Sequence, residues 1–297
     1  MGMSAHVWAG NGLCLVAIFL LQLIPMPFQQ IAMLDIGQGD SLLFQDGTIQ
    51  VLVDGGPGAQ VLERLTEEMP WYDKKLEVVV VTHFDRDHAE GITHVLQRYE
   101  VGMVMLPNYR PTTNIGRQLL SQIIDKKIPY RFGWYGQLLI AGGMQFRVMS
   151  PIPGQEWERL AKSKSNNASL IMRADIQDVS MLLTGDAEKG IETQLLNSVS
   201  SQALDVDILK VGHHGSKTST SQQFLNVVTP STSLISVSAD NTYGHPTAEV
   251  LSRLTNTTIF RTDLNGTISF FRDENSWRVR CGNKSNLLFG QHVCINK

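Results

Sequence analysis

An apolar run leads directly into a cluster of histidines and aspartates, and this combination limits the folds that the chain can adopt. Residues 78–81 are four consecutive valines, a pattern typical of a strand buried on both faces of a sheet. The cluster that follows contains His83, Asp85, Asp87 and His88 within six positions. Imidazole and carboxylate groups at this density can converge on one or two divalent cations. The alternative is a solvated acidic turn without ligands.

Composition places the chain among globular proteins. It has 297 residues, of which 42% are hydrophobic and 18% charged, enough for one large or two ordinary domains. The net charge of −3 gives no basic footprint for tight nucleic-acid binding, although bound cations would still permit nucleic acid as a substrate. The three cysteines form no Cys-x-x-Cys pair, which argues against a thiolate zinc site. Cys281 and Cys294 either pair in an oxidising compartment or remain free thiols.

The N-terminal segment is apolar and almost uncharged from residue 7 to residue 28. A spanning helix needs roughly 20 such residues, and Pro25 and Pro27 end this stretch. The first basic residue is Arg64, so the basic region of a signal peptide is missing. We expect residues 1–30 to be an uncleaved membrane anchor, with a signal peptide or a buried first helix as alternatives. Residues 31–297 are expected to form one domain.

From residue 31 onward, short apolar strands alternate with turns and amphipathic helices, which predicts two sheets with helices outside. Only residues 163–167 are strongly loop-like. We expect helices at residues 60–68, 90–99, 115–126, 188–196, 221–228 and 247–254. We expect strands at residues 31–35, 41–44, 49–53, 76–81, 103–106, 144–149, 169–174, 179–183, 206–210, 234–237, 258–261, 267–271 and 277–281.

Further polar residues stand at the ends of predicted strands, where a rigid element can aim them at a shared site. Asp186 follows Gly185 and can reach into a cleft to bridge two metals, or it caps a turn. His213 and His214 are adjacent, so one can bind metal while the other contacts a phosphate or a leaving group. His245 is either a general acid, a phosphate contact or an ordinary loop histidine.

Candidate substrate contacts surround these groups. Ser216 and Lys217 follow the paired histidines and are donors of the kind that hold phosphate. Near the N-terminal end, glycine-rich turns carry Gln38 and Asp40, which can line the site. Asp54 can orient the metal-binding residues from behind. A purely structural role is the alternative for each residue of these turns.

These clusters, in this order, resemble the metallo-β-lactamase superfamily, and more narrowly the hydrolase domain of the ComEC competence proteins. The matching stretches are residues 34–41, 53–56, 83–88, 166–170, 182–186 and 213–216. The resemblance implies an α/β fold, a four-layer αββα sandwich with a metal site between the sheets. It implies that His213 contacts the phosphate with His245 as helper, and that Asn167 belongs to the substrate site. The implied metal ligands are His83, Asp85, Asp87, His88, Asp186 and His214.

The chain departs from the wider superfamily at two positions. Asp85 stands where the usual pattern has a second histidine of the first cluster, and Asn166 and Asn167 stand where a separate histidine is usual. Both changes remove imidazole from the same metal position. They favour a harder or weaker first site, hence manganese or occupancy by a single ion.

The leading functional hypothesis is hydrolysis of phosphodiesters, DNA above all, by a zinc- or manganese-dependent enzyme of DNA uptake. Asp87 would position or deprotonate the attacking water, His213 would stabilise charge on the phosphate, and His245 would assist the leaving oxygen. The domain would be extracytoplasmic, tethered by the N-terminal segment, with a channel protein as a partner; a secreted or periplasmic protein is the alternative. Other functions are a small-molecule phosphodiesterase, similar to phosphorylcholine esterases, and a non-catalytic membrane-tethered binding factor.

Overall fold

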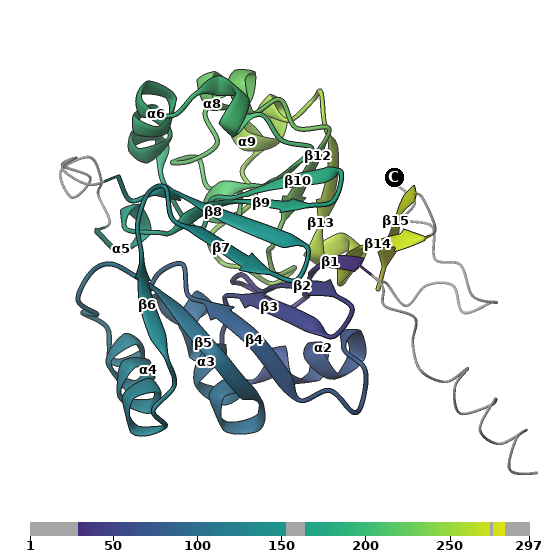
Figure 1. Ribbon diagram of the computed structural model, residues 1–297. Helices are drawn as coiled ribbons and strands as arrows, with labels where there is room; N and C mark the ends of the chain where they lie inside the picture. Colours follow the sequence, from purple (N-terminus) through teal and green to yellow (C-terminus); the bar gives the residue numbers. More distant parts are fainter. Residues whose placement is uncertain (1–28, 153–163, 274–275, 283–297) are drawn as a thin grey trace, which may run out of the picture.

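The computed structural model describes residues 29–152, 164–273 and 276–282. Over these ranges two β-sheets pack face to face, and helices cover their outer faces (Figure 1). The predicted αββα sandwich is therefore confirmed. Residues 1–28 of the predicted N-terminal segment lie outside the described residues, and so does Cys294. Within the described ranges, no helix is both long enough and apolar enough to span a bilayer.

The first sheet has eight strands, in the order β15-β14-β1-β2-β3-β4-β5-β6. Strands β3 to β6 run parallel to one another and the remaining pairs are antiparallel. Strands β14 and β15, which come late in the chain, thus complete the sheet beside β1. The bounds are β1 Gln29–Met33, β2 Leu42–Asp46, β3 Ile49–Val53, β4 Lys75–Val80, β5 Glu100–Pro107, β6 Tyr130–Gly133, β14 Ile268–Asp273 and β15 Ser276–Cys281.

The second sheet has seven strands, in the order β13-β12-β11-β10-β9-β8-β7. Strands β10 to β13 are parallel, so their carboxyl ends meet at one edge. The bounds are β7 Leu138–Ala141, β8 Met144–Ser150, β9 Ile171–Ile176, β10 Val179–Leu183, β11 Ile208–Lys210, β12 Thr232–Ile235 and β13 Thr258–Arg261.

The longer helices cover the two outer faces. The helices of the first half are α2 (Gln60–Glu68), α3 (Arg86–Arg98) and α4 (Asn114–Asp125). Those of the second half are α5 (Lys164–Asn167), α6 (Lys189–Ser198), α7 (Ser201–Leu204), α8 (Gln222–Val228), α9 (Ala248–Arg253) and α10 (Thr262–Asn265), with a short turn η2 (Gly212–Gly215). The short α5 and α10 belong to neither of the helical layers.

Three apolar clusters hold the layers together. The central cluster joins the facing sides of the sheets, where the rings of Phe44 and Phe146 meet edge to face at 5.1 Å. A second cluster packs α2, α3 and α4 on the first sheet, for example through Ile92. A third packs α6, α8 and α9 on the second sheet, for example through Phe224. The central cluster therefore holds the two sheets together beside the edge where the polar residues gather.

The structure corrects the sequence analysis at several points. Helix α3 begins at Arg86 rather than at residue 90, because Asp85 takes the extended N-cap conformation and acidic Asp87 suits the first turn. The expected loop at residues 163–167 contains the helical turn α5 from Lys164 onward. Strands β6 and β7 were not predicted. Both are short edge strands with half-exposed side chains, which lack a buried apolar pattern.

Candidate metal centre

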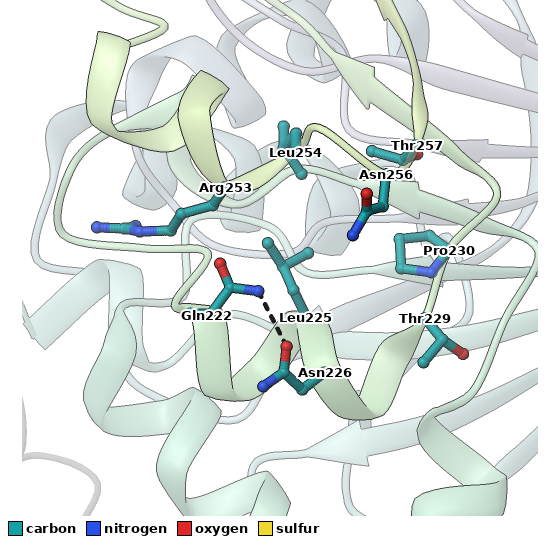
Figure 2. Close-up of a pocket in the computed structure, with 9 residues that line it drawn as sticks. All are labelled: Gln222, Leu225, Asn226, Thr229, Pro230, Arg253, Leu254, Asn256 and Thr257. Carbon is teal, nitrogen blue, oxygen red and sulfur yellow. Dashed lines mark hydrogen bonds between the residues drawn. The ribbon is translucent and has the colours of Figure 1, made fainter.

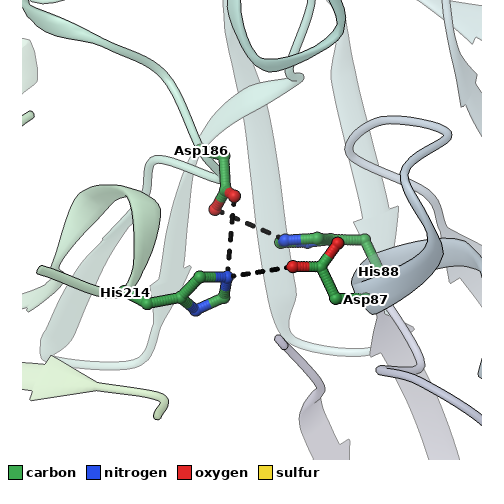
Figure 3. A group of neighbouring side chains, drawn as sticks. All are labelled: Asp87, His88, Asp186 and His214. Carbon is green, nitrogen blue, oxygen red and sulfur yellow. Dashed lines mark ion pairs between the residues drawn. The ribbon is translucent and has the colours of Figure 1, made fainter. Parts of the chain in front are cut away.

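Four predicted ligands converge where strands of both sheets end. Asp87 and His88 lie in the first turn of α3, just after β4, whereas Asp186 follows β10 and His214 follows β11. One ligand atom from each of the four lies within 4.8 Å of the others (Figure 3). Parallel strands deliver these side chains to the same edge, so the sheets themselves fix the cluster.

The distances within the cluster leave room for an ion. Nε2 of His88 lies 3.4 Å from Oδ1 of Asp186, and Nε2 of His214 lies 3.5 Å from Oδ2 of the same carboxylate. Oδ2 of Asp87 is also 3.5 Å from Nε2 of His214. Within the described part of the chain, both Nε2 atoms and Oδ1 of Asp186 are buried without a hydrogen-bond partner. Buried polar atoms are seldom unpaired, so this convergence fits a divalent cation.

The far side of each imidazole is anchored. Nδ1 of His88 lies 2.8 Å from Oδ2 of Asp54, and Nδ1 of His214 lies 2.9 Å from the carbonyl oxygen of Ser236. We assign the ring proton to Nδ1 in both, because only then does each contact have a donor. The Nε2 lone pairs therefore point into the cluster. Metal-binding histidines in proteins are usually oriented in this way.

Asp54 also organises His83, the first histidine of the cluster. Its carboxylate accepts hydrogen bonds from the backbone N–H and the hydroxyl of Thr82, at 2.7 and 2.6 Å. The Thr82 oxygen in turn lies 3.0 Å from Nδ1 of His83 and can accept its proton. Burial and neighbouring His88 lower the pKa of His83 to about 4, so its ring is neutral at pH 7. Its Nε2 lies 3.8 Å from Oδ2 of Asp85.

A hydroxyl chain that the sequence did not predict holds Asp85. The hydroxyl of Tyr109 accepts from the backbone N–H of Phe84 at 2.9 Å and lies 2.9 Å from the hydroxyl of Ser165. Ser165 donates to Oδ1 of Asp85 at 2.8 Å. Burial raises the pKa of Tyr109 to about 12, which keeps it a proton donor. Asp85 is thus fixed beside His83 in the place that the wider superfamily gives to a histidine.

An unusual backbone separates the two adjacent histidines. His213, His214 and Gly215 all adopt positive φ, at 49°, 53° and 82°. Each non-glycine residue in this region costs on the order of 1–3 kcal/mol, and such strain gathers at functional sites. As a result His214 enters the cluster, while Nε2 of His213 lies 3.8 Å from Oδ2 of Asp186. Thr218, which the sequence analysis did not single out as a partner of His213, orients its Nδ1 at 3.3 Å.

A pocket of about 200 Å³ opens over the cluster. The partly exposed carboxylate of Asp87 lines it, together with the predicted substrate contact Gln38 and the predicted catalytic residues His213 and His245. Its full lining is Gln38, Asp85, Asp87, Asn166, Asp186, His213, His214, Tyr243 and His245.

Three predicted substrate contacts do not line this pocket. Ser216 is buried, and its hydroxyl bonds to Thr218 instead. Lys217 is exposed outside the lining. Asn167 is fully buried, and Asn166 faces the pocket in its place. Consecutive residues of a helical turn such as α5 point about 100° apart, so only one of the two asparagines can face the site.

His245 sits at the pocket rim between two rings. It stacks on Tyr243 at 5.8 Å and lies 5.7 Å from the ring of His213. Burial and the neighbouring His213 lower its pKa to about 4. The ring is therefore neutral at pH 7, which favours the predicted phosphate contact over the predicted general acid.

A larger hollow of about 350 Å³ lies elsewhere, between α8 and the segment after α9 (Figure 2). Its wall includes Gln222 and Asn226, which hydrogen-bond to each other at 2.9 Å. Its lining consists of Gln222, Leu225, Asn226, Thr229, Pro230, Arg253, Leu254, Asn256 and Thr257. None of these lining residues is a histidine, cysteine, aspartate or glutamate, so the hollow offers no imidazole, thiolate or carboxylate ligand.

Comparison with known proteins agrees with this geometry. Over 284 residues the chain is 31% identical to ComE operon protein 3 of Bacillus subtilis, covering 88% of this chain and 35% of that protein. It is 25% identical to competence protein ComA of Neisseria gonorrhoeae, covering 91% of this chain and 36% of that protein. The chain therefore spans about a third of the length of these relatives.

The fold has solved counterparts. The metallo-beta-lactamase fold protein YhfI from Bacillus subtilis superposes with a TM-score of 0.51 at 13% identity, covering 79% of this chain and 96% of that one. The family model of the metallo-beta-lactamase superfamily matches residues 34–239, which include every predicted metal ligand. With its ligand cluster and its two-sheet architecture, this chain belongs to the metallo-beta-lactamase superfamily of metal-dependent hydrolases.

Proposed function

We propose that this domain hydrolyses phosphodiester bonds in DNA with a bound divalent cation, in the context of DNA uptake. The observation that carries the proposal is the convergence of Asp87, His88, Asp186 and His214, in which the Nε2 atoms of both histidines lack hydrogen-bond partners within the described chain. These four side chains lie beside a pocket lined by two further imidazoles. Similarity to a protein named for competence supports DNA as the substrate.

The ligand chemistry favours manganese over zinc in the half of the site that contains His83. Asp85 supplies a hard oxygen there, and its carboxylate is fixed by Ser165. Carboxylates suit manganese and magnesium, whereas imidazoles suit zinc. His83, Asp85 and Asp186 would hold one ion, and Asp87, His88, Asp186 and His214 a second. A cation in either position supplies charge stabilisation and makes water acidic near neutral pH.

The protein's own groups perform the proton and phosphate chemistry. Burial alone would raise the pKa of Asp87, but the nearby imidazoles of His214, 3.5 Å away, and His88 outweigh it and hold the pKa well below its usual range. Asp87 is therefore a carboxylate at neutral pH and can accept a proton from the attacking water. His213 and neutral His245, which line the pocket, would donate N–H groups to the phosphate oxygens.

An exposed aromatic ring at the pocket rim supports a nucleic-acid strand as the substrate. Tyr243 is 71% exposed and stacks on His245. A nucleobase can stack on an exposed tyrosine whatever its sequence, with an energy of about 1–3 kcal/mol per base. This contact would place the adjoining phosphate beside the imidazoles.

The test is a hydrolysis screen of purified protein on single- and double-stranded DNA with manganese, zinc or magnesium. We expect manganese-dependent cleavage that Asp87→Asn reduces by at least 10²-fold, as removal of a general base does. The matched control Asp125→Asn, at an exposed helix end, should retain activity. Absence of cleavage with all three metals, or full activity of Asp87→Asn, would refute the proposal.

A small-molecule phosphodiesterase is the second candidate, favoured by the pocket volume of about 200 Å³. Such a space accepts one phosphodiester group and little else. A panel of small phosphodiesters in the same screen distinguishes the two functions. Higher kcat/KM on a small diester than on DNA would favour the second candidate.

We also propose that the domain acts outside the cytoplasm, tethered to the membrane and associated with a DNA channel protein. The apolar stretch at residues 7–28 and the greater length of the competence relatives support this. A C-terminal alkaline phosphatase fusion should be active, because that reporter works only after export. An inactive phosphatase fusion together with an active β-galactosidase fusion would contradict it.

A further inference from the structure

Lys210 is a buried cation that the reaction outlined above does not use. It is the last residue of β11 and only 1% exposed, and among the described residues it is the only lysine or arginine that is buried. Lysine is almost never fully buried unless it is paired. Its position directly behind the metal cluster therefore needs an explanation.

The Lys210 ammonium lies against the Asp186 carboxylate on the side away from the pocket. Its Nζ forms an ion pair with Asp40, donates to the carbonyl oxygen of Gly185 at 2.9 Å and lies 3.6 Å from Oδ1 of Asp186. The side chain therefore touches both Asp186 and the residue that precedes it.

Asp40 links this ammonium to the imidazoles. Its Oδ1 lies 3.4 Å from Nδ1 of His214, and its Oδ2 lies 3.8 Å from Nδ1 of His88. The backbone N–H of Asp40 also donates to the carbonyl oxygen of Asp87 at 3.1 Å. The pair of Lys210 and Asp40 thus lies on the Nδ1 side of both rings, opposite the Nε2 atoms that face the cation.

We propose that Lys210 is a positioning residue for the metal centre. Its ammonium lies against Oδ1 of Asp186 and fixes the backbone at Gly185, which holds the carboxylate with Oδ1 toward His88 and Oδ2 toward His214. The inference rests on the metal-binding part of the proposed function and not on the identity of the substrate. Lys210 is absent from the pocket lining, so contact with substrate is not its role.

The competing explanation is that Lys210 only neutralises buried Asp40. The double variant Lys210→Met/Asp40→Asn separates the two, because it removes both charges and leaves the net charge of the cluster unchanged. We expect it to fold and to bind Mn²⁺ about 10- to 100-fold more weakly in calorimetric titration, the usual loss for a residue that orients ligands. We also expect the visible absorption spectrum of its Co²⁺ complex to differ from that of the wild type, because Asp186 has lost its contact.

Single variants assign the effect. Asp40→Asn keeps the contacts of Lys210 with Gly185 and Asp186, so it should change the Co²⁺ spectrum less than the double variant does. The matched control is Asp125→Asn/Lys126→Met, the same chemical change at an exposed helix end. It should bind Mn²⁺ and Co²⁺ as the wild type does.

The inference is overturned if the double variant folds with wild-type Mn²⁺ affinity and Co²⁺ spectrum, or if Asp40→Asn alone changes the spectrum as much as the double variant.

Should the double variant not fold, Lys210→Arg replaces it. That variant keeps the charge opposite Asp40, but its planar guanidinium cannot reproduce a point contact. A changed Co²⁺ spectrum with an unchanged melting temperature supports the inference, and a wild-type spectrum overturns it. A wild-type protein that binds no metal would contradict the proposed function instead.

Discussion

Nδ1 of His88 lies 2.8 Å from Oδ2 of Asp54, an aspartate that is itself fully buried and has a positive φ of 59°. The same carboxylate binds the backbone and the hydroxyl of Thr82. A single residue therefore sets the ring orientation of His88 and, through Thr82, that of His83. The geometry of two metal ligands depends on an aspartate that does not face the pocket.

Replacing this carboxylate should weaken metal binding. Both carboxylate oxygens of Asp54 accept hydrogen bonds, from the N–H and hydroxyl of Thr82 and from Nδ1 of His88. Asparagine offers only one acceptor oxygen, so Asp54→Asn leaves one of these three donors poorly paired. We expect Mn²⁺ affinity to fall about 10- to 100-fold and the free energy of unfolding to fall by about 1–3 kcal/mol. Calorimetric titration and urea unfolding measure the two effects. Asp125→Asn serves as the control, and unchanged Mn²⁺ affinity in Asp54→Asn would contradict the assignment.

Two glycines with positive φ provide a matched test of how the N-terminal turn packs on α3. A Cβ at Gly39 would lie 2.1 Å from the carbonyl oxygen of Asp87, whereas a Cβ at Gly58 would meet nothing within 4 Å. Gly58→Ala should cost only backbone strain, about 1–2 kcal/mol. Gly39→Ala should cost more and also weaken Mn²⁺ binding, because Asp87 must move. Equal losses of stability with unaltered metal binding would show that the turn does not position Asp87.

Asp85→His restores an imidazole beside His83 and should change the metal preference. Imidazole suits zinc better than a carboxylate does, so the ratio of zinc to manganese affinity should rise. Competitive loading with both metals, followed by elemental analysis, measures the ratio. Tyr109→Phe, which removes only the hydroxyl that holds Ser165, should leave the ratio close to that of the wild type. A ratio that Asp85→His does not raise would place Asp85 outside the ligand set.

His245→Asn should reduce hydrolysis of a p-nitrophenyl phosphodiester and of a dinucleotide by a similar factor. A neutral imidazole that contacts the phosphate serves both substrates alike, and loss of a hydrogen bond to a charged group is worth on the order of 10- to 100-fold. Comparison of kcat/KM for the two substrates measures this. A much greater loss on the dinucleotide, whose leaving group is poor, would instead identify His245 as the proton donor. His94→Asn, outside the pocket, is the control.

Glu192 provides a pH-dependent test away from the metal ligands. It lies buried in α6, where its carboxylate accepts from the backbone N–H groups of Thr220 and Ser221. Burial raises the pKa of Glu192, although these hydrogen bonds act to lower it. Since the folded pKa exceeds the unfolded one, the stabilising contribution is complete below about pH 4.3 and is lost as pH rises through the folded pKa.

The corresponding measurement is urea unfolding of the wild type and Glu192→Gln between pH 4 and pH 8. The wild type should lose stability relative to the variant as the pH rises, because glutamine does not ionise. Parallel stability profiles across this range would show that burial does not raise the pKa of Glu192.

The ligand positions could be predicted from sequence because each follows an apolar strand. The strands predicted before Asp186 and His214 end at Leu183 and Lys210, and the strands of the structure end at the same two residues. Parallel strands then bring these residues to one edge. Local pattern was sufficient here because the relevant contacts are set by strand ends.

Apart from Asp54, the supporting residues could not be predicted in this way. Tyr109 and Ser165 meet across 56 positions, and no local pattern links them. Lys210 looks like an ordinary polar strand end, and its pairing with Asp40 depends on how the sheets pack. Asn167 was chosen over Asn166 because a sequence string does not show which side of α5 faces the pocket.

The ligands are divided between the two halves of the chain, and this sets the order of assembly. During synthesis from the N-terminus, Asp87 and His88 emerge well before Asp186 and His214. The first sheet is also incomplete until β14 has been synthesised, because β14 pairs with β1. Cation uptake therefore belongs to the end of maturation, when both halves have docked. A bound ion would then link the two sheets. Removal of the ion by a chelator should therefore loosen the contact between the sheets before either sheet unfolds.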